Sequence, residues 1–219
     1  MGYVYEDQVR QDILRMIPED GRVIGSIGCG RAATEATLVA QGREVHGVDV
    51  SSEAVEAASA RLTSARVVRP DERELFATDS LDGLILADVI EHIPAAWQAL
   101  ADFARFVRPG GWVVISVPNM RNLWEMRQYV WRGDWPEDET GIFDRTHVQF
   151  MTHRRLERWT RSAGLTVDQW FARPDPRHPR ATPLLLAANR LLFGALSHVL
   201  DYQIQVRCRK PAPPRGGTP

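Results

Sequence analysis

The sequence predicts a doubly wound α/β fold, in which a mostly parallel seven-stranded sheet carries helices on both faces. Short β-rich runs alternate with helical stretches along most of the chain, as in parallel sheets with crossover helices. A glycine turn, Gly28-Cys29-Gly30, follows the first predicted strand, and Asp49 ends the second. A length of 219 residues suits one such domain, and we expect residues 1–208 to form it.

The first half of the chain gives these elements in order. Apolar residues at helical spacing predict a helix near residues 9–17, ended by Pro18. The glycine turn begins a helix that runs to about residue 40, and Ser51 or Ser52 can cap the next helix. Strands are predicted at residues 22–27, 44–48, 66–68, 84–87, 112–117, 165–171 and 202–208.

Two further helices are predicted between the later strands. Pro94 suits the first turn of a helix that continues to Arg108 and is ended by Pro109-Gly110-Gly111. Thr152 caps another helix, which Gly164 ends. The residues expected to face inward from the first of these helices are Trp97, Leu100, Phe103, Ala104 and Val107.

Two segments depart from the strand–helix pattern. Residues 118–150 lose the periodicity and are rich in aromatics, which predicts an irregular lid or acceptor insert; its tryptophans either wall an acceptor pocket or form the core of the lid. Residues 172–200 begin basic and become very apolar, which suits contact with a membrane surface or packing on the domain or across a homodimer interface. Residues 209–219 are expected to be a disordered tail.

Composition excludes several classes of protein. The net charge of −1 provides no general attraction for a nucleic-acid backbone. Two cysteines are too few for a disulfide framework, and no apolar run is long enough to cross a membrane. The first residues lack the features of a signal peptide. We expect a cytoplasmic protein, with peripheral membrane contact through residues 173–200 as an open alternative.

The glycine turn and the aspartate together predict a cofactor site. Glycines allow a sharp turn and a close approach of the ligand to the backbone, and the helix behind them presents unpaired amides. Asp49 ends the neighbouring strand, where a carboxylate can accept both hydroxyls of a ribose. The spacing from Gly28 to Ala33 also satisfies the loose dinucleotide pattern G-x-G-x-x-A, so a nicotinamide cofactor stays open at this point.

Longer motifs resemble those of the class I S-adenosylmethionine-dependent methyltransferases. They lie at residues 24–30 (IGSIGCG), 45–49 (VHGVD), 81–93 (LDGLILADVIEHI) and 108–111 (RPGG). Residues 116–119 (SVPN), 133–135 (GDW), 144–147 (DRTH) and 150–152 (FMT) resemble the branch of the ubiquinone-biosynthesis and methionine-biosynthesis W-type enzymes. The resemblance implies that one of the last two strands is antiparallel.

The resemblance also implies roles for single residues. Gly28 and Gly30 would pass the methionine and ribose parts of S-adenosylmethionine, Asp49 would bind the ribose, Asp71 the adenine amino group, and Asp88 would line the methionine end. The chain departs from the family at two positions, with Ser26 where an acid is usual and Ala32 where a third glycine is common. The complete expected set is Ser26, Gly28, Cys29, Gly30, Asp49, Val50, Asp71, Asp88 and His92.

Candidate catalytic residues come from the histidines. A poor nucleophile such as a sugar hydroxyl needs a base, and imidazole titrates in a suitable range. His147 is the first candidate, with Asp144 to orient it, although the two could equally pin the insert to the core. His92 could likewise only brace the loop after Asp88. The histidines show no convergent cluster, so no metal site is expected.

We therefore expect an S-adenosylmethionine-dependent methyltransferase that releases S-adenosylhomocysteine and acts, most simply at oxygen, on a small-molecule, sugar-bearing or lipid-linked acceptor. Two alternatives stay open. One is an NAD(P)-dependent oxidoreductase, although none of the tyrosines at positions 3, 5, 129 and 202 has a lysine four residues later. The other is a cofactor-binding partner protein without catalysis, which the serine at position 26 favours.

Overall fold

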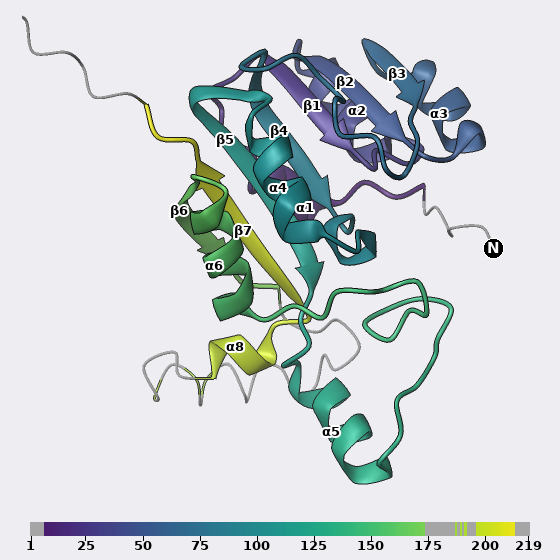
Figure 1. The fold of residues 1–219 in the computed structure, drawn as a ribbon, viewed down its shortest axis with the longest axis vertical. Helices are drawn as coiled ribbons and strands as arrows, with labels where there is room; N and C mark the ends of the chain where they lie inside the picture. The colour runs from purple at the N-terminus through teal and green to yellow at the C-terminus, as the bar shows by residue number, and fades with distance from the viewer. Residues whose placement is uncertain (1–6, 174–186, 188, 190, 192–195, 213–219) are drawn as a thin grey trace, which may run out of the picture.

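The computed structural model describes residues 7–173, 187, 189, 191 and 196–212. Its centre is one seven-stranded sheet in the order β3-β2-β1-β4-β5-β7-β6 (Figure 1). Strands β1 to β5 are parallel, and β7 runs antiparallel to both of its neighbours, which confirms the predicted topology. The strands are β1 (Val23–Ile27), β2 (Glu44–Asp49), β3 (Ser64–Val67), β4 (Leu81–Ala87), β5 (Val107–Pro118), β6 (Thr166–Phe171) and β7 (Gln203–Arg209).

Helices cover both faces of the sheet because successive strand residues point to opposite sides. Leu84 of β4 packs in one apolar cluster together with α4 and α6, and the adjacent Ile85 packs in a second cluster together with α1, α2 and α3. In Figure 1, α4 and α6 lie in front of the sheet. The helices are α1 (Gln11–Leu14), α2 (Ala33–Ala40), α3 (Ser52–Ser59), η1 (Ile90–His92), α4 (Ala96–Ala104), α5 (Leu123–Arg132), α6 (His153–Ser162) and α8 (Ser197–Leu200).

The boundary between α4 and β5 differs from the prediction. The helix ends at Ala104, and Val107 already belongs to β5, so the Pro-Gly-Gly sequence lies within the strand and does not end the helix. The glycines instead accommodate an irregular register opposite β4, where Gly111 packs against the Asp82 carbonyl. Trp97 was expected to face inward but is 48% exposed.

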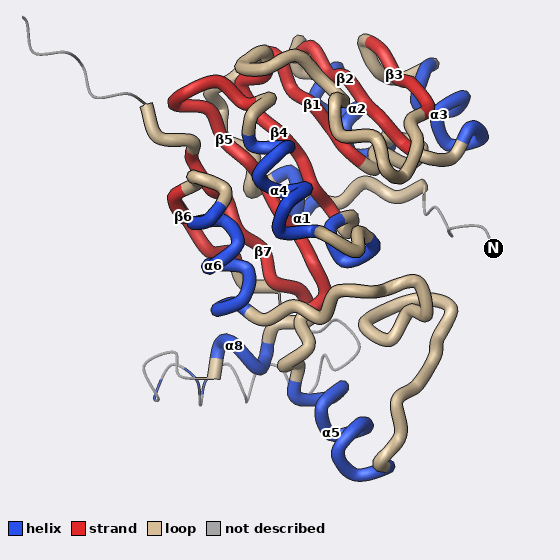
Figure 2. Tube along the Cα trace, in the orientation of Figure 1, coloured by secondary structure: helices blue, strands red, loops and turns tan. Residues whose placement is uncertain are grey.

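The insert at residues 118–150 is less irregular than expected, because it contains α5. Asn122 caps this helix by accepting hydrogen bonds from the amides of Trp124 and Glu125 at 3.0 and 3.3 Å. Gly133, with φ of +65°, ends it. Long loop stretches follow α5, which projects away from the sheet (Figure 2). The sequence did not predict this helix because α5 is exposed along most of its length and therefore has no continuous apolar stripe.

Asp201, which lies just before the start of β7, connects the insert to this strand. Its backbone carbonyl accepts hydrogen bonds from the side-chain amides of Asn119 and Asn122 at 2.8 and 3.2 Å. Its carboxylate accepts from the Arg173 amide at 3.1 Å. Burial raises the pKa of Asp201 to about 6, against the opposing effect of this amide.

The two remaining segments are described only in part. The apolar helix expected within residues 172–200 lies mostly outside the described residues, apart from α8. Of the residues expected in the tail, Arg209 pairs with β5 as part of β7, and the Lys210 ammonium bonds Asp79 at 2.8 Å. No helix among the described residues is both long and apolar enough to span a membrane.

Packing at the sheet centre can be tested at Gly83. A methyl group there would overlap the indole ring of Trp112, which is fully buried. We expect Gly83→Ala to lower the free energy of unfolding by about 1–3 kcal/mol, as overpacking does. Urea unfolding followed by tryptophan fluorescence measures the change. Gly42→Asn is the control, because that site is open and left-handed, and a shift as large there would contradict the packing argument.

The buried Asp201 carboxyl predicts a pH dependence of stability. The pKa of Asp201 is about 6 in the folded protein against an ordinary value of 3.8. The protonated carboxyl therefore contributes stability to the folded state that is fully present below pH 3.8 and is lost as the pH rises through 6. Asp201→Asn removes the ionisation and keeps an oxygen for the Arg173 amide. We expect the free energy of unfolding of the variant, relative to that of wild type, to increase by up to about 3 kcal/mol as the pH rises from 4 to 7. Urea unfolding at each pH measures this difference. A difference that is constant with pH would refute this.

Candidate functional site

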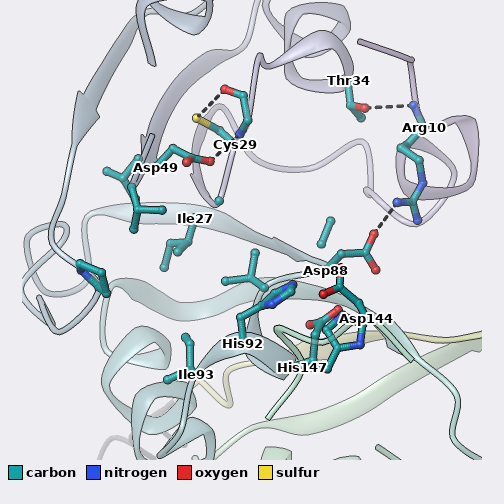
Figure 3. A pocket seen from close by; sticks show the side chains of 18 of the residues that line it. Arg10, Ile27, Cys29, Thr34, Asp49, Asp88, His92, Ile93, Asp144 and His147 are labelled. Atoms are coloured by element: carbon teal, nitrogen blue, oxygen red, sulfur yellow. Dashed lines mark hydrogen bonds and ion pairs between the residues drawn. The ribbon is translucent and has the colours of Figure 1, made fainter. Parts of the chain in front are cut away.

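A cavity of about 620 Å³ opens at the carboxyl end of the parallel strands. Its wall comes from the loops after β1, β2, β3 and β4, together with the N-terminal segment, the insert and the start of β7. Figure 3 shows Cys29 and Asp49 on one side and Asp88, His92, Asp144 and His147 gathered on the other. This is the edge at which ligands bind in open α/β sheets.

The glycine turn has the conformation that the sequence predicts. The amides of Gly28 and Cys29 both donate to the Val48 carbonyl, at 2.8 and 3.2 Å, which folds the turn over the end of β2. Gly28 has φ of +67°, and a Cβ there would lie 2.5 Å from Val89. Only glycine therefore fits at position 28, for reasons of both conformation and space.

Asp49 connects this turn to the next helix. One carboxylate oxygen accepts from the Gly30 amide at 2.8 Å, and the other accepts from the Ser51 amide at 2.9 Å. Ser51 in turn caps α3 by accepting from the Ala54 amide. The side chain is 3% exposed and lines the cavity, as does the neighbouring Val50. The carboxylate thus lies where a ligand over the glycine turn would meet it.

A carboxylate from α2 lies next to Ser26, the position at which the family resemblance implies an acid. Ser26 is buried behind the cavity wall and donates a 2.7 Å hydrogen bond to the carboxylate of Glu35, which lines the cavity. Burial raises the pKa of Glu35, although the Ser26 hydrogen bond opposes the shift. Glu35 was not among the residues expected at this site; its place in the first turn of α2 was the available signal. Ala32 adopts the left-handed conformation, with φ of +59°. Glycine adopts this conformation most readily, which explains why a glycine is common at this position in the family that the chain resembles.

The structure does not bring Asp71 to the cavity. A backbone hydrogen bond from the Glu72 amide to the Arg69 carbonyl closes a turn that points Asp71 into solvent. Its side chain is 84% exposed and pairs with Arg69 at 3.5 Å. Glu72 lines the cavity instead, one residue further along the same turn. Asp71 is not among the residues that line the cavity, and its expected contact with the adenine stays a prediction.

Asp88 lines the cavity and is held there from both sides. The Arg10 guanidinium donates to one of its oxygens at 2.6 Å (Figure 3). The Gln203 side-chain amide donates to the other oxygen at 2.6 Å. Its backbone is left-handed, with φ of +56°, a conformation that aspartate tolerates better than most residues. Arg10 also pairs with Asp12 at 2.8 Å. Nothing in the residue pattern indicated that Arg10 would reach this site.

The predicted Asp144–His147 pair is arranged differently from expectation. The Asp144 carboxylate accepts from the Thr146 hydroxyl at 2.6 Å and from the Thr146 amide at 2.8 Å, and not from the His147 ring. Burial alone would raise the pKa of Asp144, but these two bonds together with the nearby His147 and His92 rings outweigh it, and the pKa is lowered. The His147 ring donates through Nδ1 to the Ile142 carbonyl at 3.1 Å.

Histidines at positions 92 and 147 lie together with Glu91, which contradicts the expectation that no such cluster forms. The two imidazole centroids are 4.7 Å apart, and a Glu91 oxygen lies within 4.8 Å of a nitrogen of each ring. Neither Glu91 oxygen has a hydrogen-bond partner among the described residues. Burial raises the pKa of Glu91 well above its ordinary value, and Asp88 adds to the shift. The cluster could surround a cation only if Glu91 ionised, which its burial opposes.

The tryptophans of the insert do not wall the cavity as the structure describes it. Trp135 packs edge-on against Phe143 and Phe150, with centroids 5.0 and 4.8 Å away, and Trp131 is 81% exposed. Trp135 therefore contacts other aromatics of the insert, although it is itself 37% exposed. The insert instead contributes Glu139, Gly141 and the Asp144–His147 turn to the cavity.

Comparisons with known proteins agree with this geometry. A model of the methyltransferase domain family matches residues 3–169. The ubiquinone biosynthesis O-methyltransferase of Burkholderia pseudomallei is 26% identical over 200 residues, covering 88% of this chain and 80% of that protein. The enzyme of the same name from Thiobacillus denitrificans is 27% identical over 161 residues, covering 69% and 68% of the two chains.

Solved structures share the fold. The methyltransferase solved with the Trm112 methyltransferase activator of Haloferax volcanii has a TM-score of 0.64 at 19% identity, covering 91% of this chain and 87% of that one. Phosphoethanolamine N-methyltransferase 2 of Haemonchus contortus, solved in complex with S-adenosyl-L-methionine, has a TM-score of 0.61 at 18% identity, covering 91% and 51%.

The family match decides against the nicotinamide-dependent oxidoreductase and the non-catalytic partner protein. The glycine turn, the aspartate after β2 and the sheet order are the features shared with cofactor-binding α/β enzymes. The chain belongs to the methyltransferase domain family and is a class I S-adenosylmethionine-dependent methyltransferase.

Proposed function

We propose that this enzyme transfers the methyl group of S-adenosylmethionine to a hydroxyl oxygen of a small-molecule, sugar-bearing or lipid-linked acceptor. The observation that carries the proposal is the pair of imidazoles, His92 and His147, on the wall of the cavity that also contains Asp49. A hydroxyl is a poor nucleophile whose proton must go to a base. The similarity to enzymes named O-methyltransferases supports the same reaction.

Cofactor placement follows from the two ends of the cavity. The ribose would lie over the glycine turn, with its hydroxyls on Asp49, and the adenine between Val50 and the Glu72 turn. The amino-acid end would lie near Glu35 and the Arg10–Asp88 pair, where the cavity offers both a cation and carboxylates. This arrangement supplies the acid that position 26 lacks.

The chemistry is an in-line displacement. The acceptor oxygen attacks the methyl carbon, the carbon–sulfur bond breaks, and S-adenosylhomocysteine leaves. The sulfonium already activates the methyl group, so the protein mainly aligns the two reactants and excludes water. Its remaining task is to take the hydroxyl proton. Burial and the neighbouring His147 lower the pKa of His92, which keeps that ring neutral and able to accept a proton near pH 7.

Other expectations on acceptor, location and assembly stay predictions. Contact with a membrane through residues 173–200 depends on a segment that lies largely outside the described residues. A cytoplasmic location and the absence of nucleic-acid binding are likewise expected from the sequence, which leaves a homodimer as one open alternative.

Cofactor placement predicts a contrast between two aspartates. Asp49→Asn loses the charge at the ribose position, and we expect it to weaken S-adenosylhomocysteine binding by about tenfold or more, as removal of a charged hydrogen bond does. Asp71→Asn is the matched control, since that side chain is 84% exposed and outside the cavity wall. Isothermal titration calorimetry measures both. Equal affinities in the two variants would show that the ribose is not held by Asp49.

General-base catalysis predicts that the imidazole pair is needed for turnover and not for cofactor binding. We expect the double variant His92→Gln, His147→Gln to lower kcat by about a hundredfold or more, with S-adenosylhomocysteine affinity unchanged. The assay uses methyl-labelled S-adenosylmethionine with a panel of phenols and sugar alcohols. His46→Gln, on β2 and outside the cavity wall, is the control. Near-normal turnover in the double variant would remove both histidines from the mechanism.

A further inference from the structure

Thr146, which was not among the expected site residues, connects two residues of the cavity wall. It lies between Asp144 and His92, which are brought together from the insert and from η1. Its hydroxyl donates to Asp144 at 2.6 Å and faces Nδ1 of His92 at 3.0 Å. Thr146 does not itself line the cavity, whereas Asp144 and His92 do.

The positions of the hydrogens in the bonds that join Asp144, Thr146 and His92 follow from which atoms can only accept. A carboxylate oxygen only accepts, so the Thr146 hydroxyl proton points to Asp144. The hydroxyl therefore presents a lone pair to His92, and Nδ1 of that ring must carry the hydrogen. The Thr146 backbone carbonyl, 3.4 Å from the same Nδ1, also only accepts and favours the same tautomer. In a neutral ring this leaves the accepting lone pair on Nε2.

We infer that Thr146 is a positioning residue that links Asp144 to His92 and thereby makes His92 the base of the methyl transfer. This rests on the proposed hydroxyl acceptor. As the oxygen–methyl bond forms and the carbon–sulfur bond breaks, the acceptor proton passes to Nε2 of His92. The resulting imidazolium is stabilised by the Asp144 carboxylate through the Thr146 hydroxyl. His147 lacks such a link, because its Nδ1 donates to the neutral carbonyl of Ile142.

Asp144 lies three residues before His147 in the sequence, but the turn links its carboxylate to His92 through Thr146. The Asp144 carboxylate closes a turn by accepting the Thr146 amide at 2.8 Å, which directs the threonine hydroxyl back to the same carboxylate. The backbone of Glu91, next to His92, accepts from the amides of Val148 and Gln149 at 2.9 and 3.0 Å. These two bonds hold the turn against η1 and so hold Thr146 against the imidazole.

The decisive experiment compares Thr146→Val with Thr146→Ser. Valine keeps the shape and removes the hydroxyl, and serine restores the hydroxyl. Long-range ¹H–¹⁵N spectra of the intact protein, with histidine labelled and the signals assigned through His92→Gln, report which ring nitrogen carries the proton. We expect Nδ1–H in wild type and Thr146→Ser, and a gain of Nε2–H in Thr146→Val.

Kinetics provide the second readout. We expect Thr146→Val to lower kcat by about tenfold to a hundredfold with KM for S-adenosylmethionine unchanged, since a misplaced tautomer impairs the base and not binding. Thr146→Ser should recover most of the rate, and the exposed Thr78→Val should match wild type. A wild-type His92 with Nε2–H, or a Thr146→Val variant with unaltered tautomer and kcat, would overturn the inference.

The spectra separate this inference from the proposed function. They need no acceptor, so the link can be tested even if no hydroxyl compound is methylated, which would count against O-methylation alone. Conversely, an intact kcat in His92→Gln with a low kcat in His147→Gln would keep O-methylation and assign the base to His147, which contradicts the inference.

Discussion

The site depends on the carboxylate of Asp49, which joins the ends of two parallel strands. By accepting the Gly30 and Ser51 amides it fixes the turn after β1 and the start of α3 in one arrangement. The glycine turn in turn bonds the end of β2 through the Val48 carbonyl. Because both contacts are to backbone, the cavity floor has a defined shape before any cofactor arrives.

Several charged side chains around this floor are held by a charged or polar partner. Arg10 pairs with both Asp88 and Asp12, Ser26 donates to the buried Glu35, and Thr146 donates to Asp144 on the opposite wall. A zwitterionic amino acid next to such pairs can exchange one partner for another without leaving a buried charge alone. The same cavity thus combines a charged end with the imidazoles beside Asp88, which is the arrangement that the proposed cofactor and acceptor positions require.

The predictions and the structure differ where a residue's neighbours in the chain are a poor guide to its surroundings. Asp71 and Glu72 are adjacent acids, and only the direction of a turn places Glu72 on the cavity wall. The Pro-Gly-Gly sequence resembles a helix stop, yet it lies within β5 because pairing with β4 competes for those residues. Asp144 precedes His147 by three residues, and its carboxylate instead bonds Thr146, which turns toward His92.

By itself, the sequence indicated a doubly wound α/β fold, the positions of its strands, the glycine turn and the aspartate after β2. These features are local, since each depends on backbone conformation or on residues that end neighbouring strands. Only the tertiary structure decided that Arg10 reaches Asp88 across 78 positions and that His92 meets Thr146 across 54. Such contacts leave no periodic pattern, because they arise when loops from separate elements converge on one edge of the sheet.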